Sequence, residues 1–217
     1  MSSVPRTPGE AAARPHRVAS HGRAAAYGFL RQWLREPRSI AALAPSGREL
    51  AGRMAAAVGR DARTVVELGG GTGSVTRALL DLGVPREQLL VLERNPALHT
   101  HLVARFPGVE VALADASDVL AVVRASRTLA PGRVDAVASS LGLLNMSQED
   151  QRRLLEGAFA VLGPAGRFVQ FTYTPRCPVP RALRAGLGLV ARRESWSLRN
   201  LPPAFVFVLR RQPAARP

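Results

Sequence analysis

Lysine is absent from this 217-residue sequence, and cysteine occurs once, at Cys177. A single cysteine forms no intramolecular disulfide and assembles no thiolate metal site. We therefore expect no disulfide and no bound metal, and we expect a cytoplasmic protein. No stretch reaches the roughly 20 apolar residues of a membrane span. No apolar core of a signal peptide precedes Tyr27. If the chain meets a membrane, we expect it to lie on the surface.

Aromatic residues are also scarce, at 5% of the chain, whereas 47% of all residues are hydrophobic. A buried core must therefore be built mainly from alanine, valine and leucine. The length suits one α/β domain with a tail or a capping segment, and we expect a monomer.

Positive charge is abundant, because 30 arginines face 16 acidic residues and give a formal net charge of +14. A bias of composition explains arginine in place of lysine, but it does not explain the surplus of bases over acids. The surplus predicts an anionic partner, either nucleic acid or an acidic membrane surface. Arginine suits such partners because its guanidinium binds phosphate through two parallel hydrogen bonds.

The first 45 residues differ from the rest of the chain. Residues 1–20 are rich in proline, alanine, arginine and serine without periodicity, which predicts a disordered tail. Residues 21–45 contain a predicted amphipathic helix at Arg23–Glu36, with Tyr27 and Trp33 on one apolar arc roughly 160° wide. Two interpretations stay open: a helix that caps the domain, and one that lies in a membrane interface.

Residues 46–211 alternate between predicted strands and helices, and a short tail at 212–217 follows. Regular alternation predicts a Rossmann-like parallel sheet with helices on both faces, and the last two of its seven strands predict a C-terminal antiparallel hairpin. The predicted strands are 64–68, 89–93, 109–113, 134–139, 166–173, 187–194 and 204–210. The predicted helices are 46–58, 74–82, 95–105, 117–127 and 148–162, the last ended by Gly163-Pro164.

A glycine-rich turn follows the first predicted strand. Glu67, Gly69, Gly71 and Gly73 have the spacing E-x-G-x-G-x-G, and ligands of parallel sheets bind at such strand ends. A nicotinamide site requires glycine or alanine at the sixth position from Gly69, where Ser74 stands, and no Gly-Lys-Ser/Thr of a P-loop follows. The spacing resembles motif I of the class I methyltransferases, which implies S-adenosylmethionine as cofactor.

Two acidic residues support this interpretation. Glu93 ends the second predicted strand, where a carboxylate can accept hydrogen bonds from both ribose hydroxyls of a cofactor, and we include its neighbour Arg94. Asp115 follows the third strand, where in methyltransferases an acid accepts from the adenine amino group and the next backbone N–H, here that of Ala116, faces the ring.

The sequence further resembles the bacterial phospholipid N-methyltransferases over about residues 29–211. The segments that carry the resemblance are Phe29-Leu30-Arg31-x-Trp33, Ala44-Pro45-Ser46, motif I, Ser139-Ser140-Leu141, Gly166–Tyr173 and Arg199-Asn200-Leu201-Pro202-Pro203-Ala204. The family often has proline where Gly70 and Gly142 stand here. The resemblance implies methylation of the amine of phosphatidylethanolamine or its partly methylated forms, by a peripheral protein on the cytoplasmic membrane surface.

Several residues are candidates for the acceptor side of the site. Tyr173 and Tyr27 are candidate catalytic residues, and Ser139 is a candidate for cofactor binding. Arginines beyond the fifth strand are expected to meet the lipid phosphate, and Trp33 can face a methylated ammonium by a cation–π contact. The candidate substrate-binding residues are Trp33, Ser140, Arg176, Arg181, Arg199 and Asn200.

Three alternatives remain open. An rRNA adenine N6-methyltransferase has a similar motif I, but the segment Ser139–Leu143 lacks the amide and the aromatic residue that hold a flipped base. The second alternative is a small-molecule methyltransferase. The third is a non-catalytic cofactor-binding protein, against which the acids Glu67, Glu93 and Asp115 argue.

Overall fold

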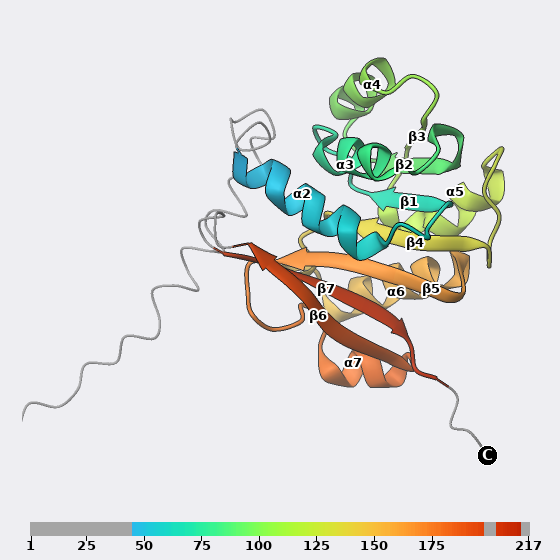
Figure 1. Cartoon of the computed structure of the whole chain (residues 1–217). Helices are drawn as coiled ribbons and strands as arrows, with labels where there is room; N and C mark the ends of the chain where they lie inside the picture. Colours follow the sequence, from blue (N-terminus) through green and yellow to red (C-terminus); the bar gives the residue numbers. More distant parts are fainter. Residues whose placement is uncertain (1–44, 198–202, 214–217) are drawn as a thin grey trace, which may run out of the picture.

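The computed structural model describes residues 45–197 and 203–213. Their strands form one seven-stranded sheet in the order β3-β2-β1-β4-β5-β7-β6 (Figure 1). The pairs among β1 to β5 are parallel, whereas β7 is antiparallel to both β5 and β6. The predicted Rossmann-like sheet with its C-terminal antiparallel hairpin is therefore confirmed.

The strands are β1 (Val65–Leu68), β2 (Leu89–Glu93), β3 (Glu110–Leu113), β4 (Val134–Ser139), β5 (Leu162–Thr172), β6 (Leu189–Ser197) and β7 (Ala204–Arg211). The α-helices are α2 (Pro45–Val58), α3 (Ser74–Leu82), α4 (Pro96–Arg105), α5 (Val119–Ala125), α6 (Gln148–Val161) and α7 (Arg181–Gly186). Short 3-10 turns are η2 (Arg86–Gln88), η3 (Ala116–Asp118) and η4 (Leu143–Asn145).

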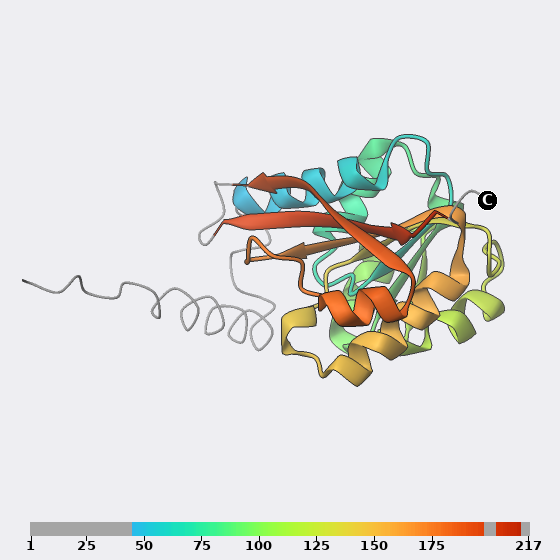
Figure 2. The same ribbon diagram turned by 90° about the horizontal axis from the view of Figure 1, so that it is seen from below.

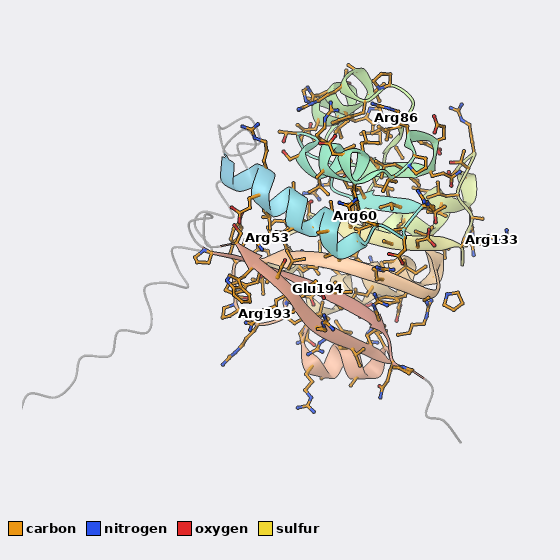
Figure 3. All side chains as sticks on the ribbon, viewed as in Figure 1. Arg53, Arg60, Arg86, Arg133, Arg193 and Glu194 are labelled. Atoms are coloured by element: carbon orange, nitrogen blue, oxygen red, sulfur yellow. The ribbon has the colours of Figure 1, made fainter. Side chains whose placement is uncertain are left out.

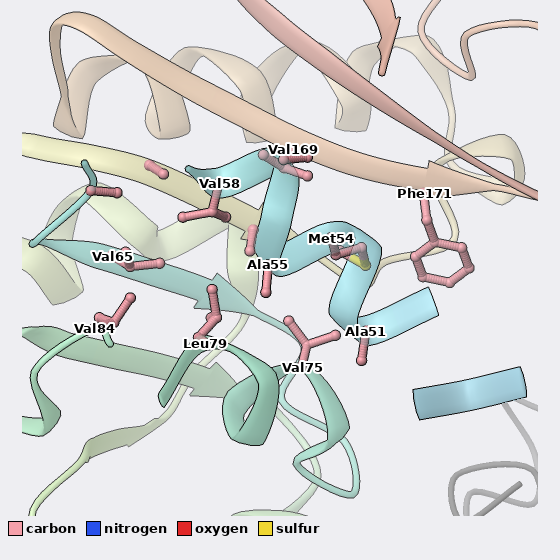
Figure 4. Close-up of a cluster of buried hydrophobic side chains, with 14 of the residues drawn as sticks. Ala51, Met54, Ala55, Val58, Val65, Val75, Leu79, Val84, Val169 and Phe171 are labelled. Carbon is pink, nitrogen blue, oxygen red and sulfur yellow. The ribbon is translucent and has the colours of Figure 1, made fainter. Parts of the chain in front are cut away.

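Helices cover both faces of the sheet, with α2 and α3 on one side and α6 and α7 on the other (Figure 2). Side chains of a strand alternate between the two faces. On the α2 face, Met54 and Val58 pack with Leu79 of α3 and Val169 of β5 (Figure 4). On the opposite face, Phe168 of β5 belongs to a second buried cluster. The sheet is thus buried on both sides, as its run of apolar strands requires.

Three local features differ from the sequence prediction. Helix α6 ends at Val161, and Gly163-Pro164 lie within β5 instead of ending the helix. The register between β4 and β5 shifts at Val134 and Ala136, which accommodates these residues. The segment predicted as one helix over 117–127 is divided into η3, whose N-terminus is capped by the Asp115 side chain through Ser117 N, and α5. Arg181 begins the short helix α7, an element that was not predicted from the sequence.

Several sequence predictions lie outside the described residues. These are the tail 1–20, the helix at Arg23–Glu36 with Tyr27 and Trp33, and the pair Arg199 and Asn200. Among the residues that the structure describes, no helix combines the length and the apolarity needed to cross a bilayer.

Candidate functional site

The glycine turn joins the end of β1 to the start of α3. Gly69, Gly71 and Gly73 have φ values of +80°, +54° and +81°, a region that residues with a side chain rarely adopt. A Cβ at Gly73 would collide with the Phe106 ring, whereas a Cβ at Gly71 would meet nothing within 4 Å. The turn therefore packs against the protein at Gly73 and is open at Gly71, as a ligand cradle requires.

Gly70, where the resembling family often has proline, is equally constrained. A Cβ there would lie 2.5 Å from Val91 Cγ1 and 2.7 Å from Leu102 Cδ1. In this chain, branched side chains of β2 and α4 occupy the space that a larger residue would need. The glycine is thus matched to its neighbours.

Glu67 is completely buried beneath this turn. Thr76 Oγ1 donates to Glu67 Oε2 at 2.7 Å. Glu67 Oε1 is buried and has no hydrogen-bond partner among the described residues. Burial raises the pKa of the Glu67 carboxyl to about 8, and the charge of Glu93 contributes in the same direction. The site therefore holds a carboxyl that is mostly protonated at neutral pH and has one oxygen without a hydrogen-bond partner among the described residues.

Glu93 ends β2 and holds the turn from the other side. Its Oε2 accepts from Gly71 N at 2.9 Å, and its Oε1 accepts from Asn95 N at 2.8 Å. The side chain is nearly buried. Because each carboxylate oxygen has two lone pairs, both oxygens can still accept a further hydrogen bond from ligand hydroxyls.

Asp115 lies beyond the end of β3, next to Ala116 at the start of η3. Its Oδ1 accepts from the Ser117 N and Oγ at 2.9 and 2.8 Å. These bonds hold the pKa of Asp115 below its ordinary value. The other oxygen, Oδ2, lies 3.9 Å from Arg94 Nη1 in an exposed pair. An ionised, half-exposed acceptor thus stands where the adenine amino group was expected.

The segment after β4 forms the opposite wall. Ser139 is buried, and its Oγ accepts from Leu141 N at 3.4 Å, while Ser140 N donates to Leu68 O at 2.9 Å. Gln170 of β5 donates through Nε2 to Leu141 O at 2.8 Å and to Phe171 O at 2.7 Å. A Cβ at Gly69 would lie 3.0 Å from Leu141 Cδ2. Leu141 therefore closes against the glycine turn.

The remaining acceptor-side candidates surround the end of β5. Tyr173 is half-buried and makes an edge contact with Phe171, with ring centroids 5.6 Å apart. Arg176 and Arg181 are both exposed. The structure brings the end of β5 beside the end of β4, so Tyr173 and Ser140 belong to one edge of the sheet.

Three positioning residues were missed by the sequence analysis. Thr76 binds Glu67, Gln170 binds the carbonyl of Leu141, and Gln151 Nε2 donates to Leu143 O at 2.7 Å. Thr76 could have been found from the sequence, because it lies nine residues after Glu67, in the first turn of the helix that follows the glycine turn. The two glutamines gave none, because their partners are backbone carbonyls.

These residues fit the expected cofactor. S-adenosylmethionine carries a positive charge at its sulfur and its amino group, and Glu67 Oε1, which has no partner among the described residues, becomes an acceptor when the buried carboxyl loses its proton. The open cradle at Gly71 admits a ligand to the backbone. Glu67, the glycine turn, Glu93 and Asp115 are thus the residues that would hold it.

Comparison of the sequence with curated proteins finds a relative that is a lipid N-methyltransferase. The chain is 33% identical over 151 residues to an ornithine lipid N-methyltransferase of Singulisphaera acidiphila. The match covers 68% of this chain and 77% of that protein. No family profile matches the chain.

Solved structures share the fold at low sequence identity. The 1,6-didemethyltoxoflavin-N1-methyltransferase of Burkholderia thailandensis superposes with a TM-score of 0.62 at 16% identity, over 92% of this chain and 93% of that one. The magnesium protoporphyrin IX methyltransferase of Synechocystis gives 0.59 at 11% identity, over 91% and 100%. These structures share the fold, and the 33% identity over 68% of the chain shows the family. The chain belongs to the same family as the ornithine lipid N-methyltransferase, and it is a class I S-adenosylmethionine-dependent methyltransferase.

Proposed function

We propose that this enzyme methylates the amine of a membrane lipid head group, namely phosphatidylethanolamine or its partly methylated forms. An ornithine head group is the second candidate, because the relative's name specifies it. Both head groups present an amine near an anion, a phosphate in one case and a carboxylate in the other. The shared chemistry is a lipid-borne amine with a neighbouring negative charge.

One observation carries this proposal: Arg176 and Arg181 are exposed, and in the chain they follow β5, whose carboxyl end lies at the same edge of the sheet as the ends of β1 and β4. Arginine binds phosphate and carboxylate through paired hydrogen bonds, so these two side chains suit either anion. The neighbouring segment Ser139–Leu143 has no aromatic residue on which a nucleic-acid base could stack. The acceptor side thus favours an anionic head group over a base.

The chain contributes positioning to this reaction. When bound, S-adenosylmethionine supplies a methyl group already activated for transfer, so the protein needs mainly to align the acceptor and exclude water. Gln170 and Ser139 hold the segment after β4 against the glycine turn. Tyr173, half-buried beside Phe171, is the polar aromatic residue that we place next to the amine. The amine must arrive as the free base, since an ammonium has no lone pair.

A labelled-methyl assay tests the proposal. The purified full chain is incubated with labelled cofactor and vesicles that contain phosphatidylethanolamine, ornithine lipid, or phosphatidylglycerol alone as the amine-free control. A parallel arm contains total RNA. We expect label in one or both amine lipids, and the two lipid arms decide the head group. Label in RNA alone, or in no lipid although the protein binds cofactor, would overturn the proposal.

A matched pair of variants tests the role of the arginines. Replacing both Arg176 and Arg181 by glutamine should raise KM for vesicle lipid about thirtyfold and leave the cofactor Kd unchanged, since each basic residue contributes about 1 kcal/mol near an anionic surface. Arg133→Gln is the control, because Arg133 lies at the opposite end of the sheet, just before β4 (Figure 3). Equal KM values for both variants would remove the arginines from the lipid site.

A further inference from the structure

Strand β6 brings its carboxyl end to the edge of the sheet that carries the cofactor residues. It is antiparallel to β7, which is antiparallel to β5, so β6 runs in the same direction as β5. The register pairs Trp196 with Phe205, and Phe205 with Thr172 at the end of β5. Trp196 is therefore level with Thr172, the last residue of β5, and β7 lies between their two strands.

Trp196 is half exposed on this edge strand, with 50% of its surface accessible. The Arg193 guanidinium lies 5.8 Å from the centroid of the Trp196 ring and 6.0 Å from that of Phe205. Among the described residues, Val190 of the same strand is also an exposed large hydrophobic residue. An indole beside an arginine, apolar at one end and polar at the other, is the residue pair that membrane interfaces favour.

The charge around Trp196 is predominantly positive. Arg192 and Arg193 are exposed on β6, and the one acidic residue of the strand, Glu194, lies 3.3 Å from Arg192 in an ion pair. Figure 3 shows Arg193 and Glu194 on this strand. Arg176, which follows β5 in the chain, and Arg181, which begins α7, are also exposed. This edge therefore complements an anionic surface.

A second copy of the chain that pairs with the outermost strand β6 is a poorer partner for this surface than a lipid bilayer. Strands that pair edge to edge are long, flat and uncharged. Here the register of β6 shifts between Arg193 and Ser195, and the consecutive charged residues Arg192, Arg193 and Glu194 interrupt it. Both features oppose the addition of another strand, whereas neither opposes contact with lipid head groups.

We propose that Trp196 and Arg193 form an interfacial anchor that docks this edge of the sheet on an anionic lipid bilayer. The inference rests on the proposed lipid substrate and adds the surface through which the enzyme meets the membrane. Docked in this way, the protein turns the carboxyl ends of β4 and β5 toward the head groups. A lipid amine can then reach the cofactor site from the head-group layer.

Co-sedimentation of the full chain with vesicles is the direct test. Vesicles of phosphatidylglycerol and phosphatidylcholine are compared with phosphatidylcholine alone, at low and high salt. Trp196→Ala should reduce the fraction bound to the anionic vesicles at least fivefold, and Arg193→Gln should flatten the salt dependence. The control is Val103→Ala, another exposed apolar residue, on α4. Unchanged binding of Trp196→Ala would overturn the anchor.

A second measurement guards against a folding defect. Trp33 is the other tryptophan of the sequence, so Trp33→Phe leaves Trp196 as the sole tryptophan, and lipids with brominated acyl chains should quench its emission. Absence of quenching in protein that co-sediments would exclude insertion. Dimerisation of the wild type that Trp196→Ala abolishes would instead assign the edge to a second copy.

Failure of the anchor differs from failure of the proposed function. If the anchor is wrong and the function right, Trp196→Ala methylates vesicle lipid as fast as the wild type. If the function is wrong and the anchor right, vesicle binding depends on Trp196 although no lipid is methylated. If both hold, Trp196→Ala loses activity on vesicles but keeps it on a short-chain, water-soluble phosphatidylethanolamine.

Discussion

Replacing Glu67 by glutamine should abolish a pH dependence of stability that the wild type shows. The carboxyl has an ordinary pKa of 4.5, and burial raises it to about 8 in the folded protein. Between these values the folded chain binds more protons than the unfolded chain. The contribution of Glu67 to the free energy of unfolding is therefore greatest below pH 4.5 and is lost as the pH rises from 4.5 through 8.

The magnitude follows from the two pKa values. A tenfold change in an ionisation constant corresponds to about 1.4 kcal/mol, so complete ionisation costs the wild type at most about 5 kcal/mol, and about 3 kcal/mol is already lost at pH 7. Glutamine keeps the acceptor for Thr76 Oγ1 and carries no proton to lose. Glu67→Gln should thus equal the wild type near pH 5 and exceed it by a few kcal/mol at pH 8.5.

Urea unfolding at half-unit steps from pH 5 to 9 measures this difference. Glu149→Gln, on the first turn of α6, is the control for loss of a carboxyl at the surface, and it should follow the wild type. Parallel curves for Glu67→Gln and the wild type from pH 5 to 8 would refute the reasoning, because the Glu67 carboxyl would then titrate alike in both states.

Three further outcomes are expected. Binding of the cationic cofactor should expel the proton of Glu67, so titration calorimetry in buffers of different ionisation enthalpy should report proton release near pH 7, and S-adenosylhomocysteine, without the sulfonium charge, should release less. Gly73→Ala should lower the free energy of unfolding by about 2 to 4 kcal/mol through its φ and the Phe106 ring. Gly132 shares the positive φ, but a Cβ there would meet no neighbour, so Gly132→Ala should lower the free energy of unfolding by less. An equal decrease in both variants would contradict the collision of a Cβ at Gly73 with the Phe106 ring. Gln170→Ala should lower kcat while the cofactor Kd stays constant, and a matching rise in that Kd would show that the residue serves the cofactor instead.

Much of the fold could be predicted because strands and turns here are marked by local chemistry. The predicted bounds of β2 (89–93), β4 (134–139) and α3 (74–82) agree with the structure, since apolar runs mark the two strands and flanking glycines delimit the helix. The start of β5 was missed because Gly163-Pro164 is usually a chain break. Only the tertiary pairing of Leu162 with Val134 makes it part of a strand.

The cofactor-binding residues were predictable in the same way, whereas the residues that hold the surrounding backbone in position were not. Glu67, Glu93 and Asp115 each end a strand or follow one, so topology alone brings them together. Gln170 acts on Leu141, 29 residues away, through a backbone carbonyl, and no residue type marks such a partner. The roles of Tyr27 and Trp33 remain predictions on residues outside those described.

The two backbone hydrogen bonds of Glu93 have a consequence for how fast the enzyme is loaded. Because Gly71 and Asn95 are already fixed by this carboxylate, and Arg105 Nη1 already binds Thr72 O at 2.8 Å, the turn has its shape before any ligand arrives. The conformational entropy of the glycine turn is therefore lost during folding and not during cofactor binding. Association should then follow a single exponential phase whose rate rises linearly with cofactor concentration.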